Sequence, residues 1–169
     1  DGGRALFTSL MQQCAKLMQS IVSHPRPVIA DVRGVASAAG CQLVASCDLA
    51  IASSEARFAT PGVNIGLFCS TPMVALSRKV SQKHAMEMLL TGEIISADRA
   101  YQIGLVNRVH APEEMDDAVR RIAGLIASKS LMSLATGKAA FYRQVDMALP
   151  DAYAYTADVM IENMLKHDA

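Results

Sequence analysis

The run 34–45 (GVASAAGCQLVA) constrains the fold of this chain more than any other segment. It follows a short apolar segment, 28–32, and has only small side chains before Gln42. We expect a strand that ends at Gly34 and a helix that begins near Ala38, whose first N–H groups have no partner within the helix. Such donors favour developing negative charge on an oxygen atom. On these residues alone, tight packing of a helix on a strand without any ligand is the favoured interpretation.

The composition is that of a globular protein. The chain has 169 residues, of which 51% are hydrophobic and 19% charged, enough for a single domain with a sizeable core. The formal net charge is zero, and lysine and arginine are scattered along the chain. This distribution gives no electrostatic support for nucleic-acid or membrane-surface binding. No apolar run approaches the length of a membrane span.

The surroundings and spacing of the four cysteines indicate whether the protein works in a reducing or an oxidising compartment. Cys14, Cys41, Cys47 and Cys69 lie among apolar or small residues and lack the spacing of metal ligands. We therefore expect reduced, mostly buried thiols in an intracellular protein, and no metal site. The compartment is the cytoplasm if the source is bacterial, and the mitochondrion is possible if it is eukaryotic.

Hydrophobic spacing predicts short strands that alternate with helices. The expected strands are 28–32, 49–52, 57–59 and 105–109. The expected helices are 4–22, 38–47, 72–80, 82–90, 97–103, 112–128, 131–147 and 151–166. The order predicts one α/β domain over 1–169, with parallel strand pairing in a core up to about 110 and a helical C-terminal arm from about 111.

Local signals place several helix ends. Ser81 and Ser96 are expected to cap helices, and Thr71 is expected to cap a helix whose first residue is Pro72. The segment 60–71 contains proline, glycine, asparagine and hydroxyl residues, which is typical of a loop.

Several short segments are weak signals singly, but their order along the chain is informative about the family. They are 24–30 (HPRPVIA), 39–43 (AGCQL), 47–52 (CDLAIA), 58–67 (FATPGVNIGL), 85–92 (AMEMLLTG), 95–98 (ISAD) and 104–109 (GLVNRV). Together they resemble the crotonase superfamily, that is, the enoyl-CoA hydratase/isomerase family. The likeness runs from about residue 25 to the end of the chain.

The resemblance implies a spiral of ββα units, a homotrimer or a dimer of trimers, and acyl-CoA thioester substrates without a further cofactor. It also implies that the Ala39 N–H is one of two backbone donors to the thioester carbonyl, the other lying on an earlier strand that this chain does not contain. We accordingly expect the chain to begin partway into the fold and to end before the family's last helix. The substrate-binding positions expected from the likeness are Ala36, Ser37, Ala38, Gly40, Pro61 and Asn64.

Two departures from the family pattern bear on catalysis. The likeness places the two hydratase glutamates at the positions of Gln42 and Gly62. Hydration needs a base for the water and an acid for the α-carbon. Because an amide can orient water but cannot take its proton, and glycine can do neither, hydration should be weak or absent.

Three classes of function are therefore weighed. The first is an acyl-CoA enzyme with altered proton transfer, and the second is an acyl-CoA-binding protein without catalysis, such as a regulatory or partner subunit. A serine peptidase of the same fold is the third and least favoured class. Ser37 lies one position away from the expected nucleophile, Ala38 occupies the nucleophile position, and no suitable histidine follows. A purely structural protein is a further alternative.

The remaining polar candidates are expected to have structural roles. Asp48 is interpreted as a cap or turn residue, Cys41 as a small buried side chain, and Glu87 as a surface or interfacial residue. No partner is evident for the four histidines, His24, His84, His110 and His167.

Overall fold

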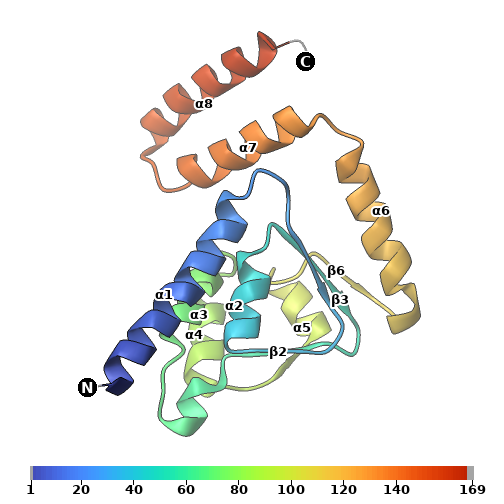
Figure 1. Ribbon diagram of the computed structural model, residues 1–169. Coiled ribbons are helices and arrows are strands. Elements are labelled where there is room, and N and C mark those ends of the chain that lie inside the picture. Colours follow the sequence, from blue (N-terminus) through green and yellow to red (C-terminus); the bar gives the residue numbers. More distant parts are fainter. Residues whose placement is uncertain (1, 167–169) are drawn as a thin grey trace.

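The computed structural model describes residues 2–166 and contains two small three-stranded sheets surrounded by helices (Figure 1). The strands are β1 (Ile29–Val32), β2 (Val35–Ser37), β3 (Leu49–Ser53), β4 (Arg57–Ala59), β5 (Ile95–Ser96) and β6 (Arg108–His110). One sheet has the order β1-β3-β6 with parallel pairing throughout. The other has the order β2-β4-β5, with β2 and β4 parallel and β5 antiparallel to β4.

Helices make up most of the rest of the described chain. The α-helices are α1 (Gly2–Ser23), α2 (Ala39–Ser46), α3 (Ser70–Leu76), α4 (Gln82–Thr91), α5 (Ala97–Gln102), α6 (Met115–Ala127), α7 (Leu131–Gln144) and α8 (Leu149–Met164). Two short 3₁₀ segments, η1 (Pro61–Ile65) and η2 (Pro112–Glu114), precede α3 and α6.

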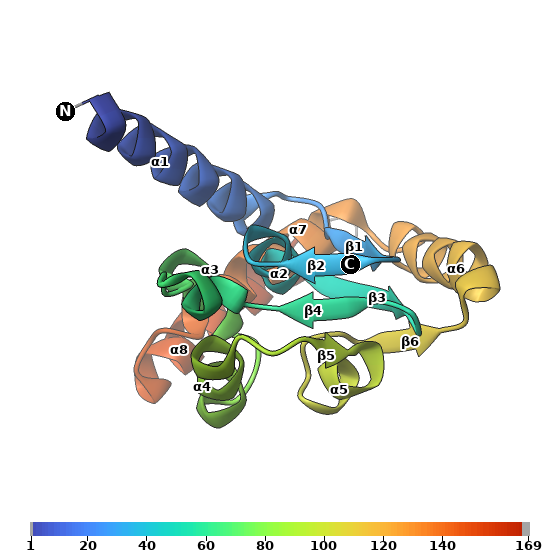
Figure 2. The same cartoon turned by 90° about the horizontal axis from the view of Figure 1, so that it is seen from below.

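The chain forms a spiral, because the strands β1 to β4 alternate between the two sheets, before β5 joins β4 and β6 joins β3. Figure 2 shows β2, β4 and β5 side by side, with β1, β3 and β6 beside one another further along. The register places Ile29 opposite Leu49 and Val35 opposite Arg57, so that one turn of the spiral lies directly on the next. The predicted α/β class with repeated ββα units is confirmed.

The main core lies between α2 and the strands. Phe58 is completely buried, and it belongs to the same apolar cluster as Cys41, Val44 and Leu76. The side chains of β3 include Ala50 and Ala52, which are small enough for helices to approach closely. A second, smaller cluster joins Ile51 of β3 to Met115 and Ile122 of α6.

Two short strands were not predicted. Residues 35–37, expected as part of a turn, form β2, and residues 95–96 form β5. A segment of two or three residues carries no measurable periodicity, and the backbone partner of both strands, β4, is distant in sequence. The last strand also begins later than expected, at Arg108, because Leu105 and Val106 are buried in a turn that bonds to the Ala100 carbonyl.

The helix-capping predictions had mixed outcomes. Ser81 and Ser96 are N-caps and accept hydrogen bonds from the His84 and Arg99 backbone N–H groups at 3.5 and 3.2 Å. The prediction for Thr71 is wrong, because α3 begins at Ser70 and its N-cap residue, Cys69, makes no side-chain capping bond. Part of the expected loop 60–71 is the 3₁₀ segment η1.

The ends of the C-terminal helices differ from the expected ones by a few residues. The segment 112–128 divides into η2 and α6, and α7 ends at Gln144 instead of 147. Pro150 lies inside the first turn of α8 instead of before it, where its missing N–H is tolerated. Because α6, α7 and α8 all follow β6, the expected helical arm from about 111 is present (Figure 1).

The helix α1 is amphipathic as predicted, but its apolar stripe is largely uncovered. No residue of α1 is buried, and Leu6, Phe7, Leu10 and Leu17 are each more than half exposed. Figure 1 shows α1 passing beside α2 and extending beyond the core. The arm helix α8 likewise exposes Tyr153, Met160 and Ile161 on its surface.

Candidate functional site

The corner between β2 and α2 is held in an unusual backbone conformation. Among residues 2–166, Ala38 is the only residue other than glycine with a positive φ, at 47° with ψ at −110°. Its N–H donates to the Ala59 carbonyl at 2.9 Å, which ties the corner to the end of β4. A positive φ is unfavourable for alanine, so the surrounding structure must fix this turn. The result is a sharp change of direction immediately before Ala39.

The N-terminus of α2 is open. The first intrahelical bond runs from the Gln42 N–H to the Ala38 carbonyl at 3.0 Å, and no described side chain caps the preceding N–H groups. Ala39 and Ser37 are exposed, whereas Ala36 is buried. An added Cβ at Gly40 would meet no atom within 4 Å. This terminus therefore presents backbone donors, and the positive end of the helix dipole, to an incoming oxygen atom.

Gln42 lies one turn into α2 and is buried, with 5% exposure. Its Oε1 accepts a weak hydrogen bond from the Cys14 thiol of α1, at a sulfur–oxygen distance of 3.6 Å. The backbone carbonyl of Gln42 accepts a hydrogen bond from the Ser46 hydroxyl at 2.8 Å. The side-chain amide of Gln42 is thus oriented by Cys14 of α1. The sequence pattern did not reveal this contact.

Gly62 lies in η1, within a tight loop over residues 60–69 that leaves no room for a side chain at this position. A Cβ there would be 2.8 Å from the Leu67 carbonyl oxygen and 3.0 Å from the Cys69 sulfur. The same loop is closed by bonds from the Gly62 N–H to the Cys69 sulfur at 3.3 Å and from the Leu67 N–H to the Gly62 carbonyl at 2.9 Å. A carboxylate at this position would require the backbone to move.

The other loop residues expected at the site have identifiable contacts within the chain. Pro61 is partly exposed, and Asn64 is exposed with its Nδ2 3.4 Å from the Gly92 carbonyl oxygen at the end of α4. Thr60, directly before Pro61, is fully buried, and its hydroxyl has no partner among the described residues. The assignment of Pro61 and Asn64 as substrate contacts stays a prediction.

The candidates expected to be structural are mostly confirmed as such. Cys41 is almost completely buried, and burial raises the pKa of its thiol to about 12, so it is a poor nucleophile. All four cysteines are free, and three of them are buried. Glu87 is exposed and pairs with Arg99 at 3.3 Å.

The expectation that the histidines lack partners is partly wrong. His84 Nδ1 lies 3.3 Å from Arg99 and 3.8 Å from Glu87, and His110 Nδ1 lies 3.7 Å from Glu114. Glu87 follows His84 by three residues along α4, and Arg99 comes from α5, whereas Glu114 of η2 follows His110 of β6 by four residues. His167 lies outside the described residues.

The described part of the chain offers few other kinds of site. No group of three or more histidine, cysteine, aspartate or glutamate side chains within residues 2–166 is placed to hold a metal ion. None of the helices described is both long and apolar enough for a membrane span. The open end of α2 is therefore the best-supported candidate site.

Comparison with known proteins identifies the family. A family model described as "Enoyl-CoA hydratase/isomerase" matches residues 2–169. The chain belongs to the enoyl-CoA hydratase/isomerase family. Its corner at Ala38 and its open helix end at Ala39 are therefore features of a member of this family.

Individual family members agree in sequence and structure. A Xenopus laevis relative, "Enoyl-CoA hydratase domain-containing protein 3, mitochondrial", is 52% identical over 166 residues, which is 98% of this chain and 56% of the relative. The crystal structure of the human protein of that name is 51% identical with a TM-score of 0.96, covering 98% of this chain and 66% of that one. A Mycobacterium smegmatis enoyl-CoA hydratase structure is 51% identical with a TM-score of 0.95, covering 97% and 64%.

The matched relatives are longer than this chain. The chain spans about half the length of the curated relatives it matches. The comparisons therefore show the fold and the family of this chain.

Proposed function

We propose that this chain binds acyl-CoA thioesters at the N-terminus of α2, where the Ala39 N–H stabilises an enolate oxygen. The observation that carries the proposal is the uncapped first turn of α2, fixed by the positive-φ corner at Ala38. Backbone donors held in place before reaction stabilise developing charge without reorganisation, and one such donor is worth about 10²–10³ in rate. Family membership supports the choice of thioester as ligand.

Hydration is expected to be weak or absent. Gln42 cannot take a proton from water, and Gly62 carries no side chain at all. Each positioned acid or base contributes about 10²–10⁴-fold, so the loss of both removes most of the hydratase rate. A non-catalytic acyl-CoA-binding role, as a regulatory or partner subunit, is the second candidate, favoured by the lack of space at Gly62.

A bulky side chain at the first residue of α2 tests the binding site. In the Ala39→Val variant, the branched side chain should crowd the oxygen position and weaken acetoacetyl-CoA binding at least tenfold, measured by titration calorimetry. Ala39 is exposed, so the fold should survive. The matched control is Ala127→Val, an exposed alanine at the end of α6. Equal binding by both variants would contradict the assignment of Ala39.

The proposed assembly is a homotrimer or a dimer of trimers. The apolar side chains that α1 and α8 leave exposed, among them Leu10, Leu17 and Met160, are more than isolated surface residues and fit burial between subunits. We expect sedimentation equilibrium at micromolar concentration to give a mass three or six times that of the chain. A monomer at that concentration would rule the trimer out. The proposed location is intracellular, and mitochondrial if the source is eukaryotic.

A further inference from the structure

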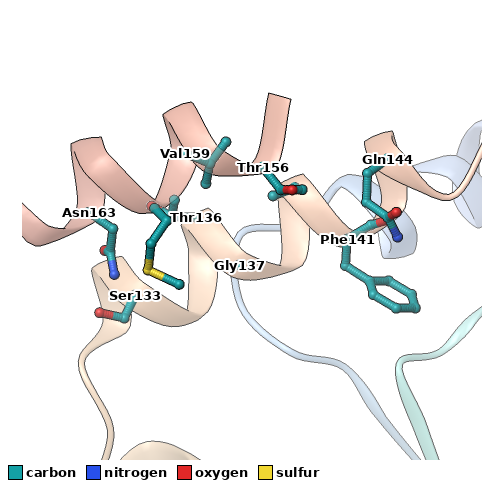
Figure 3. Close-up of a pocket in the computed structure, with 10 residues that line it drawn as sticks. Ser133, Thr136, Gly137, Phe141, Gln144, Thr156, Val159 and Asn163 are labelled. Atoms are coloured by element: carbon teal, nitrogen blue, oxygen red, sulfur yellow. The ribbon is translucent and has the colours of Figure 1, made fainter. Parts of the chain in front are cut away.

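A groove separates α7 from the core on the side away from α8. It has a volume of about 420 Å³ and is lined from the core by Pro27, Asp48 and Lys79, and from α7 by residues that include Lys138 and Tyr142. Figure 3 shows the neighbouring pocket between α7 and α8, where the ring of Phe141 projects away from α8. That ring lines the groove towards the core as well. The groove begins beyond the C-terminal end of α2, at the opposite end from Ala39.

The ammonium group of Lys138 has a hydrogen-bond acceptor for each of its three donors. Its ammonium group donates to the Ile21 and Arg26 carbonyls at 2.9 and 3.1 Å and to Asp48 Oδ2 at 2.7 Å. An ammonium has three donors, and all three are used. The Lys138 side chain is only 7% exposed, and Asp48 balances its charge.

Asp48 already pairs with Lys138 and accepts two further hydrogen bonds. Besides Lys138, its carboxylate accepts from the Val28 N–H at 2.7 Å and, through Oδ1, from the Tyr142 hydroxyl at 2.9 Å. The expectation of a cap or turn role thus understates this residue, which joins β1, β3 and α7. The carboxylate is committed to groups that hold the fold together.

Lys79 is the cation that this arrangement leaves unbalanced. Its ammonium donates to the Tyr142 hydroxyl at 3.1 Å and lies 4.9 Å from the centre of that ring. No carboxylate among the described residues lies within 4 Å of it. Partial burial lowers the pKa of Lys79, and the charge of Asp48 offsets only part of that effect. Two lysines and one aspartate give the groove one net positive charge.

We propose that this groove binds a small organic monocarboxylate, whose carboxylate pairs with Lys79 and whose apolar body lies against Pro27, Leu134 and Phe141. One negative charge matches the one uncompensated cation, and Lys79 has two donors left for the two carboxylate oxygens. Phe141 is 56% exposed, so it offers apolar surface that the chain itself does not cover. The volume is within the range of about 300–1,000 Å³ that is usual for small-molecule sites.

The probe for the test is octanoate, titrated by calorimetry into the folded protein, with octanol and inorganic phosphate as comparison ligands. Octanoate should bind saturably. Lys79→Met should weaken binding about 10–150-fold, the value of a hydrogen bond to a charged group, and Lys79→Arg should keep most of it. Lys83→Met, at an exposed lysine of α4, is the matched control and should bind like the parent.

Several results would overturn the proposal. These are unaltered octanoate binding in Lys79→Met, equal binding of octanol, or phosphate binding without octanoate binding. Loss of octanoate binding in Ala39→Val, with retention in Lys79→Met, would place the ligand at the α2 site instead. In a further outcome, the parent protein binds no octanoate but self-associates as its concentration rises, and Lys79→Met abolishes that association. This result would assign Lys79 to pairing with a carboxylate of another chain. The urea midpoint of each variant shows whether the fold is intact.

Discussion

Replacing Lys138 with methionine should lower the free energy of unfolding by about 3–5 kcal/mol, the usual effect of removing one partner of a buried ion pair. The substitution keeps most of the side-chain volume but removes donors to Asp48 and to two backbone carbonyls. Asp48 would lose its cationic partner in a site where its side chain is only 16% exposed. Urea denaturation monitored by circular dichroism measures the change.

Two further variants separate the ion pair from general effects of the substitution. Lys129→Met, at an exposed lysine beyond α6, should change stability by no more than about 0.5 kcal/mol. The double variant Lys138→Met with Asp48→Asn should be less destabilised than the sum of its single variants, because no unpaired charge remains. A loss below about 1 kcal/mol in Lys138→Met would mean that the pair does not hold α7 to the core.

Introducing one carboxylate into the candidate site should raise the hydratase activity that we expect to be weak or absent. In Gln42→Glu, a carboxylate occupies the position that the family resemblance assigns to the first glutamate, one turn into α2. We expect hydration of crotonyl-CoA to rise by about 10²-fold, the lower end for one positioned acid or base. Loss of crotonyl-CoA absorbance at saturating substrate measures the rate, with binding measured in parallel.

Adding the second carboxylate, at residue 62, should not help. A side chain at residue 62 would meet the Leu67 carbonyl at 2.8 Å, so Gln42→Glu with Gly62→Glu should be less stable and no faster than Gln42→Glu alone. Gly34→Ala, at a glycine with free space around it, serves as the control for stability. Robust hydration by the parent protein would instead point to a base outside Gln42 and Gly62.

Local sequence was sufficient to predict those features that depend on residues close together along the chain. The hydroxyl caps at Ser81 and Ser96 and the long amphipathic pattern of α1 depend only on neighbouring residues, and all of them are present. The family likeness depends on segment order, which is also a property of the sequence alone, and the family match confirms it. Helix ends were less accurate, because terminal turns such as η2 exchange between α and 3₁₀ geometry.

Contacts between distant segments required the tertiary structure. The strands β2 and β5 exist because β4 lies between them, and Asp48 is central because Lys138 and Tyr142 come from a helix some ninety residues away. The sequence shows a glycine at 62, but only the approach of the Leu67 carbonyl reveals that no side chain fits there. Sequence by itself determined most of the helices and longer strands, the family, and the presence of Gln42 and Gly62 in place of carboxylates. The tertiary structure decided which polar groups meet, because hydrogen bonds and steric exclusion depend on distances in space instead of along the chain.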